Sequence, residues 1–275
     1  MKRLPRFLPL CALFLCSCVD VPVQEAQPAR ARAVRVSQFG IQSGLSETQT
    51  LHFIVRASSS ADAERYGKLA EQDYEAVMRA TGLYSFLSDN AYELVVYSTR
   101  EEYLAKSGQP AWSAGTTLHN AIMLYDGTDA QRVLAHEMTH VIFGEFMGRP
   151  RPDLRWLNEG LAVYMETSAI AGDTLGAFRA DAAAAIRTGA MNFTMLTGYS
   201  PMQDDSSRLR DNWYMQCESV VRYLLDEGGQ LSFAVFLKAL KENSDIDNAA
   251  QLAWRGKWQG LSGIEAGWRK ANGLN

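Results

Sequence analysis

Two histidines four residues apart, with a glutamate directly after the first, form the pattern with the clearest chemistry. The motif H-E-M-T-H at residues 136–140 lies in a segment, 128–148, whose composition predicts a helix. Residues four apart on a helix lie about 40° apart around its axis, so both imidazoles project from one face and could bind one metal ion. Glu137 would lie beside that metal, where it could accept a proton from bound water. A chance pair of buried histidines is the alternative.

A catalytic zinc site commonly has a third protein ligand and an open position for water. The metzincin continuation is absent, because Phe143 and Phe146 stand where that pattern has a glycine and a third histidine. Glu159 is the candidate we select, with eighteen residues between it and His140. A glycine and two prolines within 148–152 would end the first helix and let a second run back beside it.

These paired motifs resemble those of the gluzincin metallopeptidases, especially their aminopeptidase branch and the small minigluzincin-like domains. In that family H-E-x-x-H, eighteen residues and N-E-G place two histidines and a glutamate on zinc, which here are His136, His140 and Glu159. The resemblance implies one Zn²⁺ per chain, a zincin-like fold and Glu137 as the general base. It covers residues 128–170, with a weaker extension toward residue 240.

The resemblance also points to residues around the metal. Glu166 follows Glu159 by seven residues, so it would share a helix face and could orient a ligand histidine, unless it is a solvated glutamate near a helix end. We expect Asn158, from the N-E-G motif, in the same role. Tyr214 resembles the family tyrosine that donates a hydrogen bond to the tetrahedral oxyanion, and an ordinary half-buried tyrosine is the alternative. Asp211 is expected to cap its helix, with Tyr214 in the first turn.

The order of the predicted elements indicates an α+β domain with a small mixed sheet, the motif helix and then a helical lobe. Strands are predicted at 51–56, 93–98 and 121–125, and a helix over 61–80 that ends at Gly82. Thr128 and Gln131 have the spacing of a capping box for the motif helix. We expect one metallopeptidase domain over 46–275, divided into 46–148 and 149–275. By the family resemblance, 113–117 and 121–125 would form the rim on which substrate lies.

The N-terminus resembles the signal segment of a bacterial lipoprotein. Residues 1–18 have a basic start, a short apolar stretch and a lipobox-like end at Cys18, which would be lipidated, although an ordinary cleaved signal is the alternative. Residues 19–45 have no sustained period and are expected to be a tether. These features predict an exported protein, anchored by lipid to a membrane of the bacterial envelope on its periplasmic side.

The composition excludes several classes of protein. At 275 residues and 47% hydrophobic, the chain can form a sizeable core. Removal of the three basic residues within 1–18 changes the formal charge from -4 to -7, which argues against nucleic acid as a partner. Three of the four cysteines lie within the same segment, so a disulfide framework is excluded, and the composition does not indicate an oligomeric state.

The sequence therefore predicts a zinc-dependent peptidase that acts on peptides or proteins. The G-x-M-E-N signature, with which the aminopeptidase branch binds a free amine, is absent, so we expect an endopeptidase. Two alternatives remain: a non-catalytic zinc-containing binding lipoprotein of the envelope, and a hydrolase of cell-wall peptide crosslinks.

Overall fold

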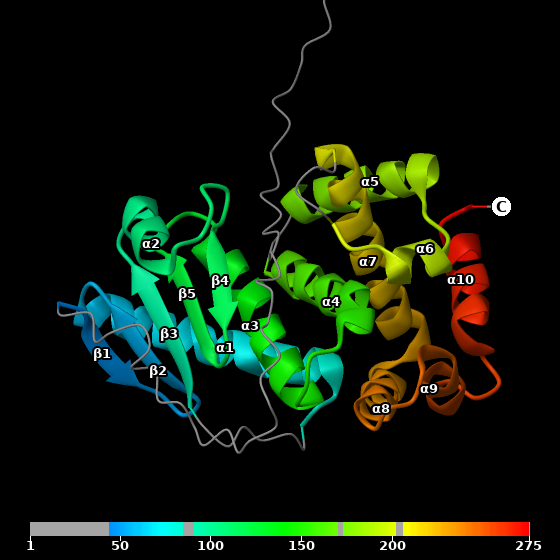
Figure 1. The fold of residues 1–275 in the computed structure, drawn as a ribbon, viewed down its shortest axis with the longest axis horizontal. Coiled ribbons are helices and arrows are strands. Elements are labelled where there is room, and N and C mark those ends of the chain that lie inside the picture. The colour runs from blue at the N-terminus through cyan, green and yellow to red at the C-terminus, as the bar shows by residue number, and fades with distance from the viewer. Residues whose placement is uncertain (1–43, 85–90, 170–172, 202–205, 275) are drawn as a thin grey trace, which may run out of the picture.

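The computed structural model describes residues 44–84, 91–169, 173–201 and 206–274, in which a small sheet with its helices adjoins a helical body (Figure 1). The strands are β1 (Ser46–Gln49), β2 (Phe53–Ala57), β3 (Tyr92–Tyr97), β4 (Gly115–Leu118) and β5 (Ala121–Tyr125). The helices are α1 (Ser60–Thr81), α2 (Arg100–Ser107), α3 (Ala130–Met147), the 3₁₀ helix η2 (Pro152–Leu154), α4 (Arg155–Ser168), α5 (Asp173–Gly189), α6 (Phe193–Gly198), α7 (Ser207–Gly228), α8 (Gln230–Lys241), α9 (Ile246–Ala253) and α10 (Gly260–Ala271). Cys18, the predicted signal segment and most of the predicted tether lie outside the described residues.

The sheet is mixed, with the strand order β1-β2-β3-β5-β4. β2, β3 and β5 run parallel to one another, while β1 and β4 pair antiparallel at the two edges. The strand predicted at 121–125 has those bounds, and the other two predicted strands are shifted by one or two residues. Because β4 is an edge strand, one of its sides is not paired within the sheet.

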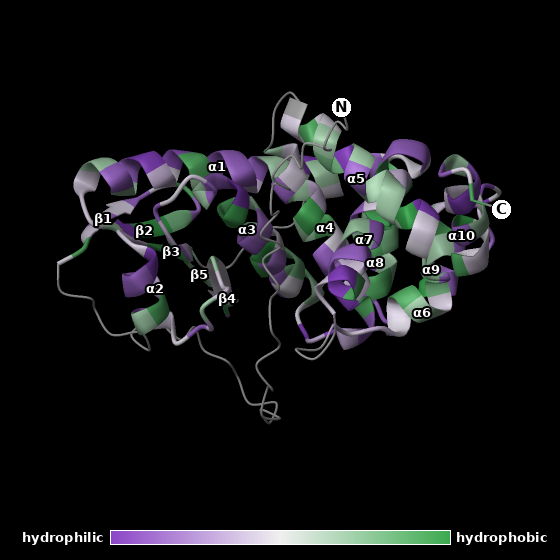
Figure 2. Cartoon of the chain, turned by 90° about the horizontal axis from the view of Figure 1, so that it is seen from above, coloured by the Kyte–Doolittle hydropathy of each residue, from purple (hydrophilic) through white to green (hydrophobic). Residues whose placement is uncertain are grey.

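Helices cover both faces of the sheet, which explains why the central strand β3 is buried along its whole length. Leu94 and Val96 face the main core, together with residues of α1 and α3, whereas Val95 and Tyr97 pack with Tyr103 of α2 on the opposite face. In Figure 2, α1 and α2 lie on opposite sides of the strands. The sheet is therefore held between two layers of helix, and α3 lies alongside it at the β5 and β4 end.

The helix that carries the H-E-x-x-H motif begins after a backbone turn. The amide of Ala130 donates to the carbonyl of Gly127, and Asp129 is the N-cap residue without a side-chain cap hydrogen bond. The capping box predicted from Thr128 and Gln131 is therefore wrong, because the N-cap position is occupied by Asp129 and Thr128 lies one residue earlier, in the turn. At the other end Gly148 adopts φ 69°, a left-handed conformation that suits glycine and ends α3. α4 then packs beside α3, as predicted.

α4 and α7 pack closely because a glycine lies at their crossing. A β-carbon on Gly160 would come within 2.5 Å of the carbonyl oxygen of Cys217, so only glycine allows this approach. α7 begins at Ser207, where the hydroxyl of Ser206 accepts a hydrogen bond from the amide of Leu209. The prediction that Asp211 caps this helix is wrong, since Asp211 lies inside it.

The second half of the described chain is helical, with α9 and α10 far from the sheet, whereas α8 also contacts α1 and α3 (Figure 1). The predicted α+β, zincin-like fold, with a small mixed sheet and a mainly helical second half, is confirmed. Among the described residues, no helix combines the length and the apolar character needed to cross a membrane.

Candidate metal centre

Three side chains from α3 and α4 meet at one point inside the protein. The Nε2 atoms of His136 and His140 are 3.1 Å apart, and Oε2 of Glu159 is 3.9 Å from the first and 3.6 Å from the second. Nitrogen and oxygen ligands of a tetrahedral zinc ion would be about 3.3 Å apart. His136 and Glu159 are buried and His140 is nearly so, so the structure brings the three predicted ligands together in a site of suitable size.

Each histidine is held through its other ring nitrogen by a residue of α4. Nδ1 of His136 donates to Oε2 of Glu166 at 3.1 Å, and Nδ1 of His140 donates to Oδ1 of Asn158 at the same distance. Burial, and then the neighbouring His136, lowers the pKa of His140 to about 4, so its ring is neutral near pH 7. Because Nδ1 of each ring contacts a residue of α4, Nε2 is the atom that each ring directs to the common point, a donor set that fits zinc.

The carboxylate of Glu137 lies between the motif helix and the edge strand β4. Its Oε2 accepts a hydrogen bond from the hydroxyl of Thr117 at 2.7 Å. Gly115, two residues earlier on β4, faces the same side chain: a β-carbon there would be 3.1 Å from Cγ and 3.5 Å from Oε1 of Glu137. The glutamate predicted as the general base is thus positioned against the strand predicted as the substrate rim.

The family model of the Peptidase MA superfamily matches residues 105–272, more than half of the chain. The chain belongs to the Peptidase MA superfamily. The matched region begins within α2 and includes β4, β5, both helices of the metal centre and α7. Membership supports a metallopeptidase function. The comparison with curated proteins gave no match.

Two arginines of this Peptidase MA chain adjoin the centre, and sequence reasoning missed both. Arg132 donates from Nη2 to Oε1 of Glu166 at 2.7 Å. Nε of Arg155 is 3.9 Å from Oε1 of Glu159, and its Nη1 donates to the hydroxyl of Ser200. Each arginine precedes a candidate ligand by four residues, a helical spacing that could have indicated them.

Tyr214 of this Peptidase MA chain is buried on α7, with 1% of its surface exposed, two turns into the helix rather than in the first turn as predicted. Its ring contacts that of Trp213 edge to face at 5.0 Å. It precedes Cys217 by three residues, and Cys217 is the residue that meets Gly160 of α4. Tyr214 is therefore on the α4 side of α7, one turn from the contact beside Glu159.

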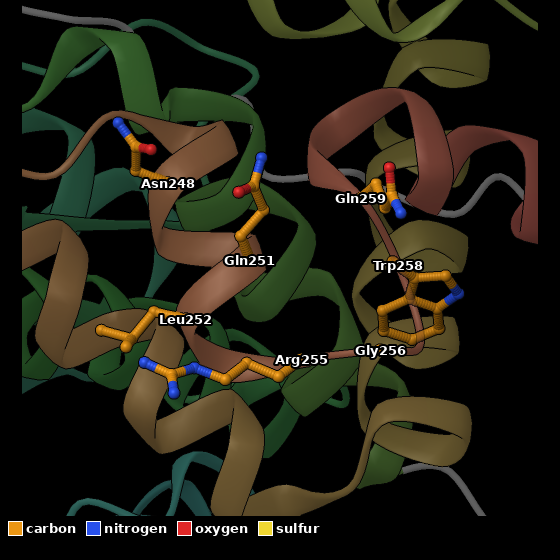
Figure 3. Close-up of a pocket in the computed structure, with 7 residues that line it drawn as sticks. All are labelled: Asn248, Gln251, Leu252, Arg255, Gly256, Trp258 and Gln259. Carbon is orange, nitrogen blue, oxygen red and sulfur yellow. The ribbon is translucent and has the colours of Figure 1, made fainter.

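A polar pocket of about 610 Å³ lies apart from the metal centre, between α9 and α10 (Figure 3). It is lined by Asn248, Gln251, Leu252, Arg255, Gly256, Trp258 and Gln259. None of these residues belongs to the H-E-x-x-H or N-E-G motif. The candidate active site is the buried group of His136, His140 and Glu159, because the candidate metal ligands and the candidate general base, Glu137, occur together there.

Proposed function

We propose that this protein is a zinc-dependent peptidase of the gluzincin type that hydrolyses peptide bonds with metal-activated water. The observation that carries the proposal is the convergence of two imidazole Nε2 atoms and a carboxylate on one point, with the carboxylate of Glu137 beside them. His136, His140 and Glu159 would hold the ion. Zinc, when bound there, supplies a Lewis acid that polarises a carbonyl and lowers the pKa of water.

Glu137 is the residue that moves the proton. Its carboxylate, which Thr117 orients through Oε2, would accept a proton from water and return it to the leaving amine. Tyr214 would donate a hydrogen bond to the substrate carbonyl oxygen as negative charge develops there. A hydrogen bond that strengthens only as charge develops raises the rate without tightening the binding of substrate.

The substrate we propose is an extended peptide segment laid antiparallel against β4. This edge strand offers main-chain hydrogen-bonding groups, and Gly115, which has no side chain, lets β4 lie directly against Val133 and Glu137 of α3, so that a peptide on β4 would be close to Glu137. Because the sequence lacks the G-x-M-E-N amine-binding signature, we propose cleavage within chains rather than removal of N-terminal residues.

We also propose that the domain spans 46–275 and is attached by the tether 19–45 to a lipid on Cys18, in the bacterial envelope. The lipobox-like sequence supports this assignment. Labelling with a palmitate analogue tests it in cells that express the wild type or Cys18→Ala. Label on the wild type and its loss from the variant are expected, and an unlabelled wild type would contradict the anchor.

The decisive experiment on the activity compares the wild type with Glu137→Gln. Metal analysis should find about one zinc per chain in both proteins, because Glu137 is not among the proposed ligands. Cleavage of a peptide library should occur only with the wild type and fall by orders of magnitude in the variant. Zinc in the wild type without cleavage would favour a non-catalytic binding protein. Isolated cell-wall sacculi, assayed in parallel, show whether peptide crosslinks are cleaved.

A further inference from the structure

The carboxylate of Glu166 is shared between a cation and a candidate metal ligand. Oε1 accepts from Nη2 of Arg132 at 2.7 Å, and Oε2 accepts from Nδ1 of His136 at 3.1 Å. The side chain of Glu166 is only 5% exposed, against 21% for Arg132. Arg132 also donates from Nη1 to Asp129 at 3.1 Å, which holds the guanidinium from a second direction.

This arrangement lets an arginine determine where a histidine points. Arg132 precedes His136 by one helical turn on α3, and Glu166 reaches both from α4. A buried carboxylate is stable as an anion only with charged or hydrogen-bonding partners. The planar guanidinium fixes the orientation of the carboxylate, and the second oxygen then lies where it accepts the Nδ1 proton of His136.

The two histidines differ in this respect. His140 is held by Asn158, whose amide is neutral and needs no counter-ion. His136 is held by a carboxylate, which needs one and which also makes the imidazole a stronger metal ligand. Loss of the arginine would therefore affect one ligand of the centre and leave the other in place.

We propose that Arg132 is a positioning residue that acts through Glu166 on His136 and thereby sets the affinity of the centre for zinc. The inference rests on the proposed zinc site. Arg132→Met removes the guanidinium but keeps an unbranched apolar side chain of moderate length. Arg132→Lys keeps the charge but loses the fork of donors.

The test measures zinc affinity by competition with a chromophoric chelator, with no substrate present. Replacement of residues that orient metal ligands typically weakens metal binding by about 10- to 100-fold, so Arg132→Met should bind zinc at least about tenfold more weakly than the wild type. Arg132→Lys should fall between the two. Wild-type affinity in a folded Arg132→Met protein would overturn the proposal, and if that variant does not fold, wild-type affinity in Arg132→Lys would do so.

Arg222 provides a matched control. It forms an ion pair with Glu218 of the same helix, α7, and the carboxylate of Glu218, like that of Glu166, is buried. The charges that act on Glu218 are those of Arg222, Arg179 and Asp226. Arg222→Met and Arg132→Met should both lower the melting temperature, because each leaves a buried carboxylate without its arginine, but Arg222→Met should leave zinc affinity unchanged. If the wild type itself does not bind zinc, the proposed function is wrong. If the wild type and the Arg132 variants bind zinc equally well, only the proposed role of Arg132 is wrong.

Discussion

The hydroxyl of Thr117 donates a hydrogen bond of 2.7 Å to Oε2 of Glu137, and it is also 3.2 Å from the main-chain oxygen of the same residue. One side chain thus connects the edge strand β4 to the helix that carries the metal-binding motif. The carboxylate of Glu137, the proposed general base, is therefore oriented by the strand on which we place the substrate.

Thr117→Val should lower the turnover of peptide while leaving zinc content unchanged. The isosteric change removes only the hydroxyl, so the Glu137 carboxylate can rotate away from the water it must deprotonate. We expect kcat to fall about tenfold, with a smaller change in KM. Thr116→Val is the control, because neighbouring residues of a strand point to opposite faces. Equal kcat for wild type and Thr117→Val would show that the hydrogen bond has no role in turnover.

Tyr214→Phe should separate the proposed oxyanion donor from a packing tyrosine. The ring stays and the hydroxyl is lost, so kcat should fall about 100-fold if the phenol stabilises developing charge. Zinc content should not change. The matched control is Tyr223→Phe on the same helix, where the ring packs against Trp258 at 5.3 Å between centroids. If Tyr214→Phe has a lower melting temperature but the same kcat as the wild type, Tyr214 contributes to packing and not to catalysis.

Asp73 should make the protein less stable as the pH rises. Burial on α1 raises its pKa from 3.8 to about 7. Between about pH 4 and pH 7 the unfolded chain has already released this proton while the folded protein keeps it, so the free energy of unfolding falls with rising pH and levels off above pH 7.

Asp73→Asn tests this dependence, because the amide cannot ionise. Urea unfolding should show the variant more stable than the wild type at pH 8, on the order of a few kcal/mol as an upper bound, with little difference at pH 4. Glu64→Gln, an exposed position on the same helix, should change neither value. A stability difference that is the same at both pH values would exclude a buried ionisable Asp73.

Gly160→Ala should be destabilising, although alanine favours helices. The added methyl would overlap the main chain of Cys217, and overpacking of this kind costs about 1–3 kcal/mol. Gly144→Ala is a matched control within α3, where a β-carbon would meet nothing within 4 Å, and it should stabilise the protein by about 0.5–1 kcal/mol. Thermal unfolding of both variants measures the difference. Stabilisation by both changes would mean that α4 and α7 are not closely packed at this position.

The features predictable from the sequence were those determined by spacing along one helix or between two. The proximity of His136 and His140 follows from the helical period, and the seven residues from Glu159 to Glu166 place both on one face of α4. The contacts of Thr117 and Arg132 were not predicted, because they cross between elements whose packing is not encoded in local periodicity.

The start of α7 illustrates a second limit of sequence reasoning. Ser206 and Asp211 are both residue types that cap helices well, and local preference does not decide between them. The cap is Ser206, so the helix begins at Ser207 instead of after Asp211. Tyr214 therefore lies two turns from the start of α7. The wrong capping box at Thr128 has a related cause, since a backbone turn competes with the side-chain cap.

α4 supplies three residues of the candidate metal centre: Asn158, Glu159 and Glu166 all belong to this one helix, while both histidines belong to α3. The geometry of the centre thus depends on how one helix, α4, packs against another, α3. A small rotation of α4 would displace all three contacts at once. The ability to bind an ion should therefore be gained and lost cooperatively, in an all-or-none manner, rather than ligand by ligand.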